Sequence, residues 1–241
     1  MSNHNHYETV GKVIFSVKEQ TDAHLLSDDT GFSDEQIYYY LLQCRSLFLY
    51  RKYRTYRDVS QKDYMTTPCM NLIDADNQCP CKPPTGCEIL MTELYLPNMI
   101  GNIISVTNPD GTKEYTPTES NLSKYRKDSR IKKFADKTSY FQLSNNKGTK
   151  LYIISDKPLK AIKVTLIPQY PEEIQRMPDC KGDNINECVA TYDLEWILDP
   201  DLTKACIDET INILLRTKSK LADVKNNGVD DNIANKQEIN V

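Results

Sequence analysis

Hydrophobic residues recur at helical spacing in the segment "FSDEQIYYYLLQCRSLFLYRKYR". The apolar positions fall at i, i+4, i+7 and i+11, and they are Ile37, Leu41, Cys44 and Phe48. Ser33 is followed three residues later by Gln36, which is the spacing of a capping box. Acidic residues stand near the start of this segment and basic residues near its end, as the helix dipole favours. The pattern predicts a helix over residues 33–54.

Two further helices are expected near the chain ends. The first, near residues 8–20, would bury Val10, Val13, Ile14 and Val17, although their β-branched side chains leave a strand open as an alternative. The segment "LLSDDTGF" would join it to the helix at 33–54 as a helical hairpin. The second lies near residues 200–220, where Asp199 can cap, Pro200 suits the first turn, and Ile207, Ile211 and Leu214 recur at helical spacing.

Between the helices, residues 64–170 have the pattern of β-strands. Short runs rich in Ile, Val, Thr and Tyr alternate with turn residues. "NIISVTNPDGTKEYTP" predicts a hairpin around Asn-Pro-Asp-Gly, "SYFQLSNNKGTKLYIIS" predicts another around residues 146–148, and "LKAIKVTLIPQY" predicts one more strand. We therefore expect an antiparallel meander.

These elements together predict an α+β fold, in which an N-terminal helical hairpin and a C-terminal helix pack with an antiparallel β-sheet or meander. We expect a single domain over residues 1–221. Residues 222–241 are polar, rich in Asn and Asp and aperiodic, and we expect them to form a flexible tail.

Composition narrows the class of protein. With 34 acidic and 30 basic residues the formal net charge is −4, which argues against a protein that wraps nucleic acid with its whole surface. No apolar run approaches the ~18 residues needed to cross a bilayer, and the N-terminus lacks the apolar core of a signal peptide. We expect a cytosolic protein without a membrane partner, whose cysteines are free, buried or metal-bound thiols.

Four of the eight cysteines cluster in "PCMNLIDADNQCPCKPPTGCEILM". Their spacing is C-x9-C-x-C-x5-C, formed by Cys69, Cys79, Cys81 and Cys87. A structural zinc site normally uses two CxxC knuckles, and here there is neither a CxxC pair nor a neighbouring histidine. The cluster is therefore a weak metal candidate, and thiols in a Pro-rich loop are the preferred interpretation. We expect no metal and no cofactor.

No set of residues supports an enzyme. Only three histidines occur, all before residue 25, which removes most Ser-His-Asp and Cys-His arrangements. With eight glycines there is no G-x-G-x-x-G motif and no P-loop. We expect a non-enzymatic protein.

Charge is distributed unevenly along the chain. Residues 45–62 hold six basic side chains against one acidic, residues 124–137 hold seven against two, and residues 179–209 hold nine acidic against two basic. The opposite charges either balance each other within one molecule or form complementary faces of a head-to-tail interface between molecules. The tyrosines at positions 50, 53 and 56 alternate with basic residues and also permit contact with a nucleic-acid backbone. The interface candidates are Arg51, Lys52, Arg54, Arg57, Lys124, Arg126, Lys127 and Arg130.

The order of elements resembles the ring proteins in the head-to-tail connector of crAss-like tailed phages. The resemblance covers roughly residues 5 to 220. It is carried by the "SDE" helix start, the Cys-rich loop that leads into "LPNMIG", and the "DPDL" start of the last helix.

This resemblance implies a virion structural protein that is assembled in the cytoplasm of the bacterial host. Copies would form a twelvefold ring below the portal, contact the portal protein and other ring or tail proteins, and line a channel through which DNA passes without sequence-specific contact. A cysteine-cluster metal-binding module and a nucleic-acid-binding module remain the alternatives.

Overall fold

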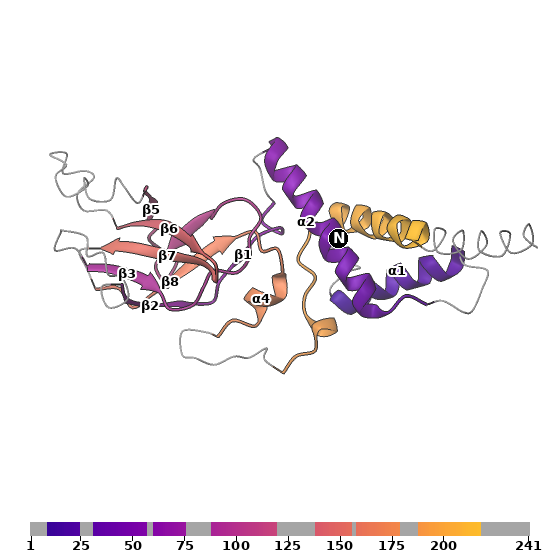
Figure 1. The fold of residues 1–241 in the computed structure, drawn as a ribbon, viewed down its shortest axis with the longest axis horizontal. Coiled ribbons are helices and arrows are strands. Elements are labelled where there is room, and N and C mark those ends of the chain that lie inside the picture. Colours follow the sequence, from indigo (N-terminus) through magenta and orange to yellow (C-terminus); the bar gives the residue numbers. More distant parts are fainter. Residues whose placement is uncertain are drawn as a thin grey trace, which may run out of the picture. The chain divides into compact units, whose positions relative to one another are not determined.

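Helices and strands occupy separate parts of the chain in a computed structural model of the protein (Figure 1). The structure describes residues 9–24, 31–56, 60–75, 88–119, 138–155, 158–178 and 188–217. The chain divides into two compact units, one of residues Met1–Phe48 with Thr191–Val241 and one of residues Leu49–Ala190. Helices build the first unit, and the second contains all the named strands. The predicted α+β fold class is confirmed.

The helical unit contains α1 (Val10–His24), most of α2 (Asp34–Tyr56), the 3₁₀ turn η2 (Thr191–Asp193) and a C-terminal helix at 200–217. The buried face of α1 consists of Val10, Val13, Ile14 and Val17, and Thr21 extends it by one turn. At its start the N–H of Val10 donates to the carbonyl of Leu194, 3.0 Å away. An ion pair joins Lys18 of α1 to Asp34 at the start of α2.

Two predicted helix caps are present. The N–H of Gln36 donates to Oγ of Ser33, and the N–H of Ser33 donates to Oε1 of Gln36. Each of these hydrogen bonds is 3.3 Å long, and together they form a capping box. At the C-terminal helix the N–H of Asp201 donates to Oδ1 of Asp199 over 3.2 Å. Both caps satisfy backbone donors that a helix start otherwise leaves unpaired.

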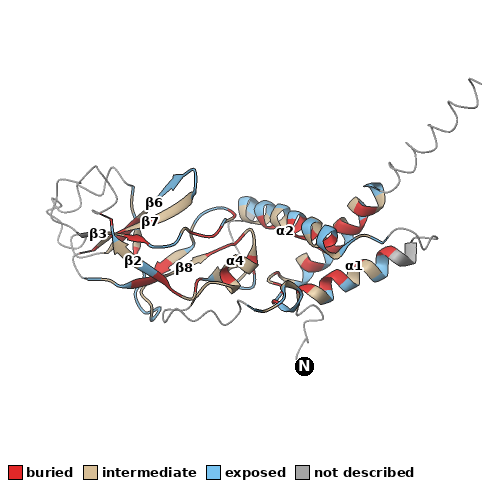
Figure 2. Cartoon of the chain, turned by 60° about the horizontal axis from the view of Figure 1, so that its bottom comes forward, coloured by how far each residue is buried: buried red, intermediate tan, exposed pale blue. Residues whose placement is uncertain are grey.

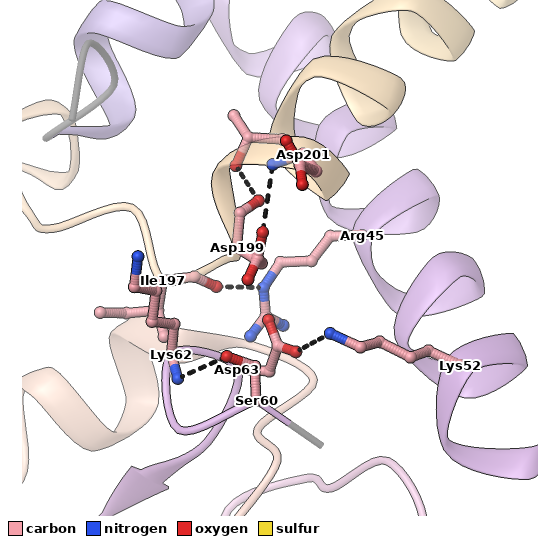
Figure 3. A network of polar contacts seen from close by, with 9 residues as sticks. Arg45, Lys52, Ser60, Lys62, Asp63, Ile197, Asp199 and Asp201 are labelled. Atoms are coloured by element: carbon pink, nitrogen blue, oxygen red, sulfur yellow. Dashed lines mark hydrogen bonds and ion pairs between the residues drawn. The ribbon is translucent and has the colours of Figure 1, made fainter. Parts of the chain in front are cut away.

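The C-terminal helix packs on the buried face of α2. Oγ1 of Thr203 accepts a 3.0 Å hydrogen bond from the indole of Trp196, while Cys206, Ile207, Thr210 and Leu214 are all buried. Arg45 of α2 is fully buried, and its Nε donates to the carbonyl of Ile197 over 2.9 Å (Figure 3). A buried guanidinium requires such acceptors, because an unpaired charge in the core is costly.

Two free cysteines meet inside this helical core. Cys44 of α2 and Cys206 of the C-terminal helix are both buried, and Sγ of Cys206 lies 3.3 Å from the carbonyl oxygen of Leu41. A hydrogen bond from Cys206 lowers the pKa of Cys44 to about 7. Hydrogen bonding to Cys44 and burial raise the pKa of Cys206, so that Cys206 keeps its proton at physiological pH.

The strands form one sheet in the order β1 (Met65–Thr66), β8 (Ala161–Leu166), β2 (Met70–Asp74), β3 (Glu88–Thr92), β7 (Gly148–Ser155), β6 (Ser139–Asn145) and β5 (Thr116–Pro117). Strand β4 (Ser105–Thr107) also pairs with β8, and the short helix α4 (Pro171–Gln175) follows β8 in sequence. The largest fully buried side chains of this core include Met70, Leu151, Ile153, Ile162 and Leu166.

Both predicted turns occur. In the first, the side chain of Asn108 accepts from the N–H of Lys113 over 3.0 Å, and Gly111 adopts a φ of +74°. In the second, Asn145 faces Gly148 across the β6–β7 hairpin, and Oδ1 of Asn145 accepts from the N–H groups of Lys147 and Gly148.

The strand order departs from a simple meander, although most pairs are antiparallel. Strand β8, the last in sequence, pairs with β1, β2 and β4, and β5 runs parallel to β6. Alternating hydrophobicity fixes which side chains of a strand face the core, but it does not specify which neighbour the strand takes. The sheet is therefore mixed.

The end of α2 is fixed within the sheet-bearing unit by a buried charge pair. Nζ of Lys52 lies 2.8 Å from Oδ2 of Asp63, whose side chain has no exposed surface (Figure 3). At the next residue of α2, the ring of Tyr53 covers Gly101, where a Cβ would lie only 2.8 Å from Cε1 of that ring. The φ of +77° at Gly101 also favours glycine.

Replacing Lys52 by Met should destabilise the sheet-bearing unit. A carboxylate left buried without its cation typically costs roughly 3–5 kcal/mol, and we expect somewhat less because Lys52 is partly exposed. Chemical denaturation measures this loss. Arg51→Met is the matched control and should change stability by less than about 0.5 kcal/mol. Combining Lys52→Met with Asp63→Asn should restore part of the loss, and equal stability of Lys52→Met and Arg51→Met would contradict the assignment.

Thiol labelling tests the helical core. In the folded chain iodoacetamide should modify the exposed Cys188 and leave Cys44 and Cys206 unmodified, because burial blocks access even to a thiol whose pKa is low. After unfolding, peptide mapping should find all three labelled. Labelling of Cys44 in the folded chain as fast as that of Cys188 would show that α2 and the C-terminal helix are not packed as described.

Candidate interaction surfaces

Three of the eight basic interface candidates lie in the described part of the chain. Arg51, Lys52 and Arg54 belong to the last turns of α2. The other five lie outside the described residues, and they are Arg57, Lys124, Arg126, Lys127 and Arg130. The structure therefore describes the basic residues at the end of α2. An interface role for the second basic segment, residues 124–137, stays a prediction.

The three basic residues of α2 have different environments. Lys52 lies on the buried side of the helix and pairs with Asp63, whereas Arg51 and Arg54 are exposed. Arg45, which also contributed to the basic count of residues 45–62, is fully buried. Fewer cations of this segment are therefore free to meet a partner than its composition indicates.

Arg54 belongs to an exposed stripe along α2 that we call the α2 face. Its members are Tyr39, Gln43, Leu47, Tyr50 and Arg54. At 100° per residue these positions fall within an arc of about 80° and extend over roughly 23 Å of helix. Three of them are large hydrophobic side chains with 43–57% of their surface exposed. Figure 2 shows the exposed side of α2 opposite its buried side.

The α2 face is a second helical pattern superimposed on the first. The buried set of α2 is centred on Ile37, Leu41 and Cys44, and the exposed hydrophobic residues recur at i, i+8 and i+11 on the opposite side. Sequence reasoning identified the first set and the basic end of the helix, but not this stripe. Its signal was the occurrence of large side chains on both faces of one amphipathic helix.

Opposite charges separate between the two units in sequence. The ranges Met1–Phe48 and Thr191–Val241 hold 17 acidic and 9 basic residues, a formal charge of −8. The range Leu49–Ala190 holds 17 acidic and 21 basic residues, a formal charge of +4. Part of the acidic segment 179–209 has a local role, since Asp199 caps a helix.

The cysteine cluster lies mostly outside the described residues. Cys79, Cys81 and Cys87 are not described, and Cys69 is 4% exposed and disulfide-bonded. For Cys69 the expectation of a free or metal-bound thiol is therefore wrong. A reducing compartment acts through thiol exchange, and exchange requires access that a buried sulfur does not offer. Among the described residues no group of three or more His, Cys, Asp or Glu side chains could hold a metal ion.

No helix in the described part of the chain is both long and apolar enough to span a membrane.

The sequence was compared with curated proteins and with models of protein families. No curated protein matches the chain. The family model described as phage tail ring protein 2 matches residues 13–232, which is most of the sequence. Because this match covers most of the sequence, the chain belongs to the phage tail ring protein 2 family of crAss-like phages.

Proposed function

We propose that the chain is a structural subunit of the phage head-to-tail connector. Copies form a cyclic ring of twelve below the portal, and the ring links the capsid to the tail. The family is one of tail ring proteins, so a structural role in the virion follows from membership, and the remainder of this assignment is our proposal.

The observation that carries the proposal is the α2 face. Tyr39, Leu47 and Tyr50 are large hydrophobic side chains, and each exposes 43–57% of its surface in the isolated subunit. Aromatic residues and arginine are enriched in protein–protein interfaces, where they supply most of the binding free energy. A long helix that presents both along one face is therefore suited to bind another protein.

Charge adds selectivity to this binding. Exposed ion pairs contribute only about 0.2–1 kcal/mol each, so basic groups such as Arg51 and Arg54 set orientation and partner choice while apolar contacts supply affinity. The same two arginines, next to Tyr50, also suit contact with phosphates of DNA in the channel of the ring. DNA contact of this kind would be independent of base sequence.

Reversing the two exposed arginines tests the proposal. Arg51→Glu with Arg54→Glu should leave the melting temperature of the subunit nearly unchanged, because both side chains are exposed, and should prevent incorporation into particles. Lys52 is omitted because its partner Asp63 is buried, so that its reversal would unfold the subunit. Incorporation is measured by quantifying the protein in purified particles.

Lys62→Glu with Lys113→Glu is the matched control, since both lysines are exposed, lie outside α2 and give the same change in charge. This variant should be incorporated normally. Normal incorporation of the arginine variant would contradict an assembly role for the end of α2. Normal incorporation combined with loss of packaged DNA would instead assign these arginines to the channel.

A further inference from the structure

A groove of about 700 Å³ lies between the exposed side of α1 and the turn η2. Phe15 of α1 and Tyr192 of η2 line it, and they expose 66% and 38% of their surface. A single exposed Phe is common on protein surfaces, but here a second exposed aromatic residue lines the same groove. The groove is therefore an apolar site on the helical unit, and it shares no residue with the α2 face.

The groove is built by a close approach of backbone segments. A Cβ on Gly11 would lie 3.1 Å from the carbonyl oxygen of Tyr192 and 3.4 Å from its Cβ. Glycine at this position thus lets η2 lie against α1. The hydrogen bond between the N–H of Val10 and Leu194 fixes the same approach.

Carboxylates predominate around the groove. The residues that line it include two carboxylates, Glu19 and Asp193, and one cation, Lys12. Partial desolvation, with further contributions from Glu35 and Asp34, raises the pKa of Tyr192, while Lys18 opposes them. Lys18 is itself paired with Asp34. The groove thus combines two exposed aromatic side chains with two carboxylates and one cation among its lining residues.

Each subunit of a cyclic ring needs two different interaction surfaces. Neighbours related by rotation within a ring contact each other through two different surfaces, one on each side of every copy. The α2 face and the groove are two such surfaces. The α2 face has aromatic residues and an arginine at its end, and the groove has aromatic residues and two carboxylates.

We infer that in the ring the groove of one copy binds the α2 face of the next copy. This inference rests on the proposed ring function and names the contact that closes the ring. The hydrophobic residues of the α2 face pack against Phe15 and Tyr192, and Arg54 lies near Glu19 or Asp193. An amphipathic helix docked in an apolar groove is a recurring mode of recognition.

The test uses two full-length variants, each with one surface disabled. Phe15→Asp disables the groove, and Leu47→Asp disables the α2 face. Both side chains are exposed, so each variant should retain its fold, which thermal denaturation checks. Leu143→Asp is the matched control, because Leu143 is 46% exposed on β6 and belongs to neither surface.

Native mass spectrometry of the purified chains then distinguishes the outcomes. Wild type and Leu143→Asp should assemble into rings, and each disabled variant alone should remain monomeric. An equimolar mixture of the two should stop at heterodimers with one copy of each, because a single functional contact remains. This arrest is specific for a head-to-tail contact between the two surfaces.

Two results overturn the inference in distinguishable ways. If wild type assembles but either folded variant also assembles, or if the mixture forms no heterodimer, the ring closes through other surfaces and the proposed function stands. If wild type stays monomeric at high concentration, self-assembly of the chain is contradicted, and this contact with it.

Discussion

The structure depends on the division of α2 into two faces. One face is buried and includes Arg45 and Cys44. Arg45 donates a hydrogen bond to the carbonyl of Ile197, and Cys44 contacts Cys206 of the C-terminal helix. The opposite face remains exposed along about 23 Å of helix although it has three large hydrophobic side chains. Burial of the first face stabilises the subunit by itself, since fully buried Leu and Ile side chains contribute roughly 1.5–3 kcal/mol each. The second face is thus available for contacts between proteins.

The same division separates two roles for positive charge. Lys52 is directed to the buried carboxylate of Asp63, where it offsets the cost of keeping that charge away from water. Arg51 and Arg54 are exposed, so their charges remain in contact with water and need no buried partner. A cluster of basic residues in a sequence therefore combines groups that stabilise the subunit with groups that can select its partners. Only the structure assigns each residue to its role, and it shows which substitutions test assembly without unfolding the chain.

The sequence predicted the parts of the fold that local chemistry determines. The Ser33–Gln36 capping box, the Asp199 cap and both hairpin turns depend on residues a few positions apart, and all are present. The strand order was not predictable in this way, because the pairing of β8 with β1, β2 and β4 joins segments far apart in sequence. The contact of the buried Arg45 with Ile197 was missed for the same reason. The pairing of Lys52 was missed because Asp63 lies beyond the end of α2, where helical spacing no longer relates the two residues. The groove at Phe15 required two segments separated by about 180 residues to meet, so no local pattern could indicate it.

The central claim is that two exposed surfaces, the α2 face and the groove at Phe15, form the contact between neighbouring copies. Electron cryo-microscopy of the assembled particle, at a resolution that separates side chains, tests it most directly. The account predicts a twelvefold ring in which Leu47 and Tyr50 of one copy are buried against Phe15 and Tyr192 of the next. A ring in which the α2 face lies in solvent, or in which it contacts only a different protein, would contradict it.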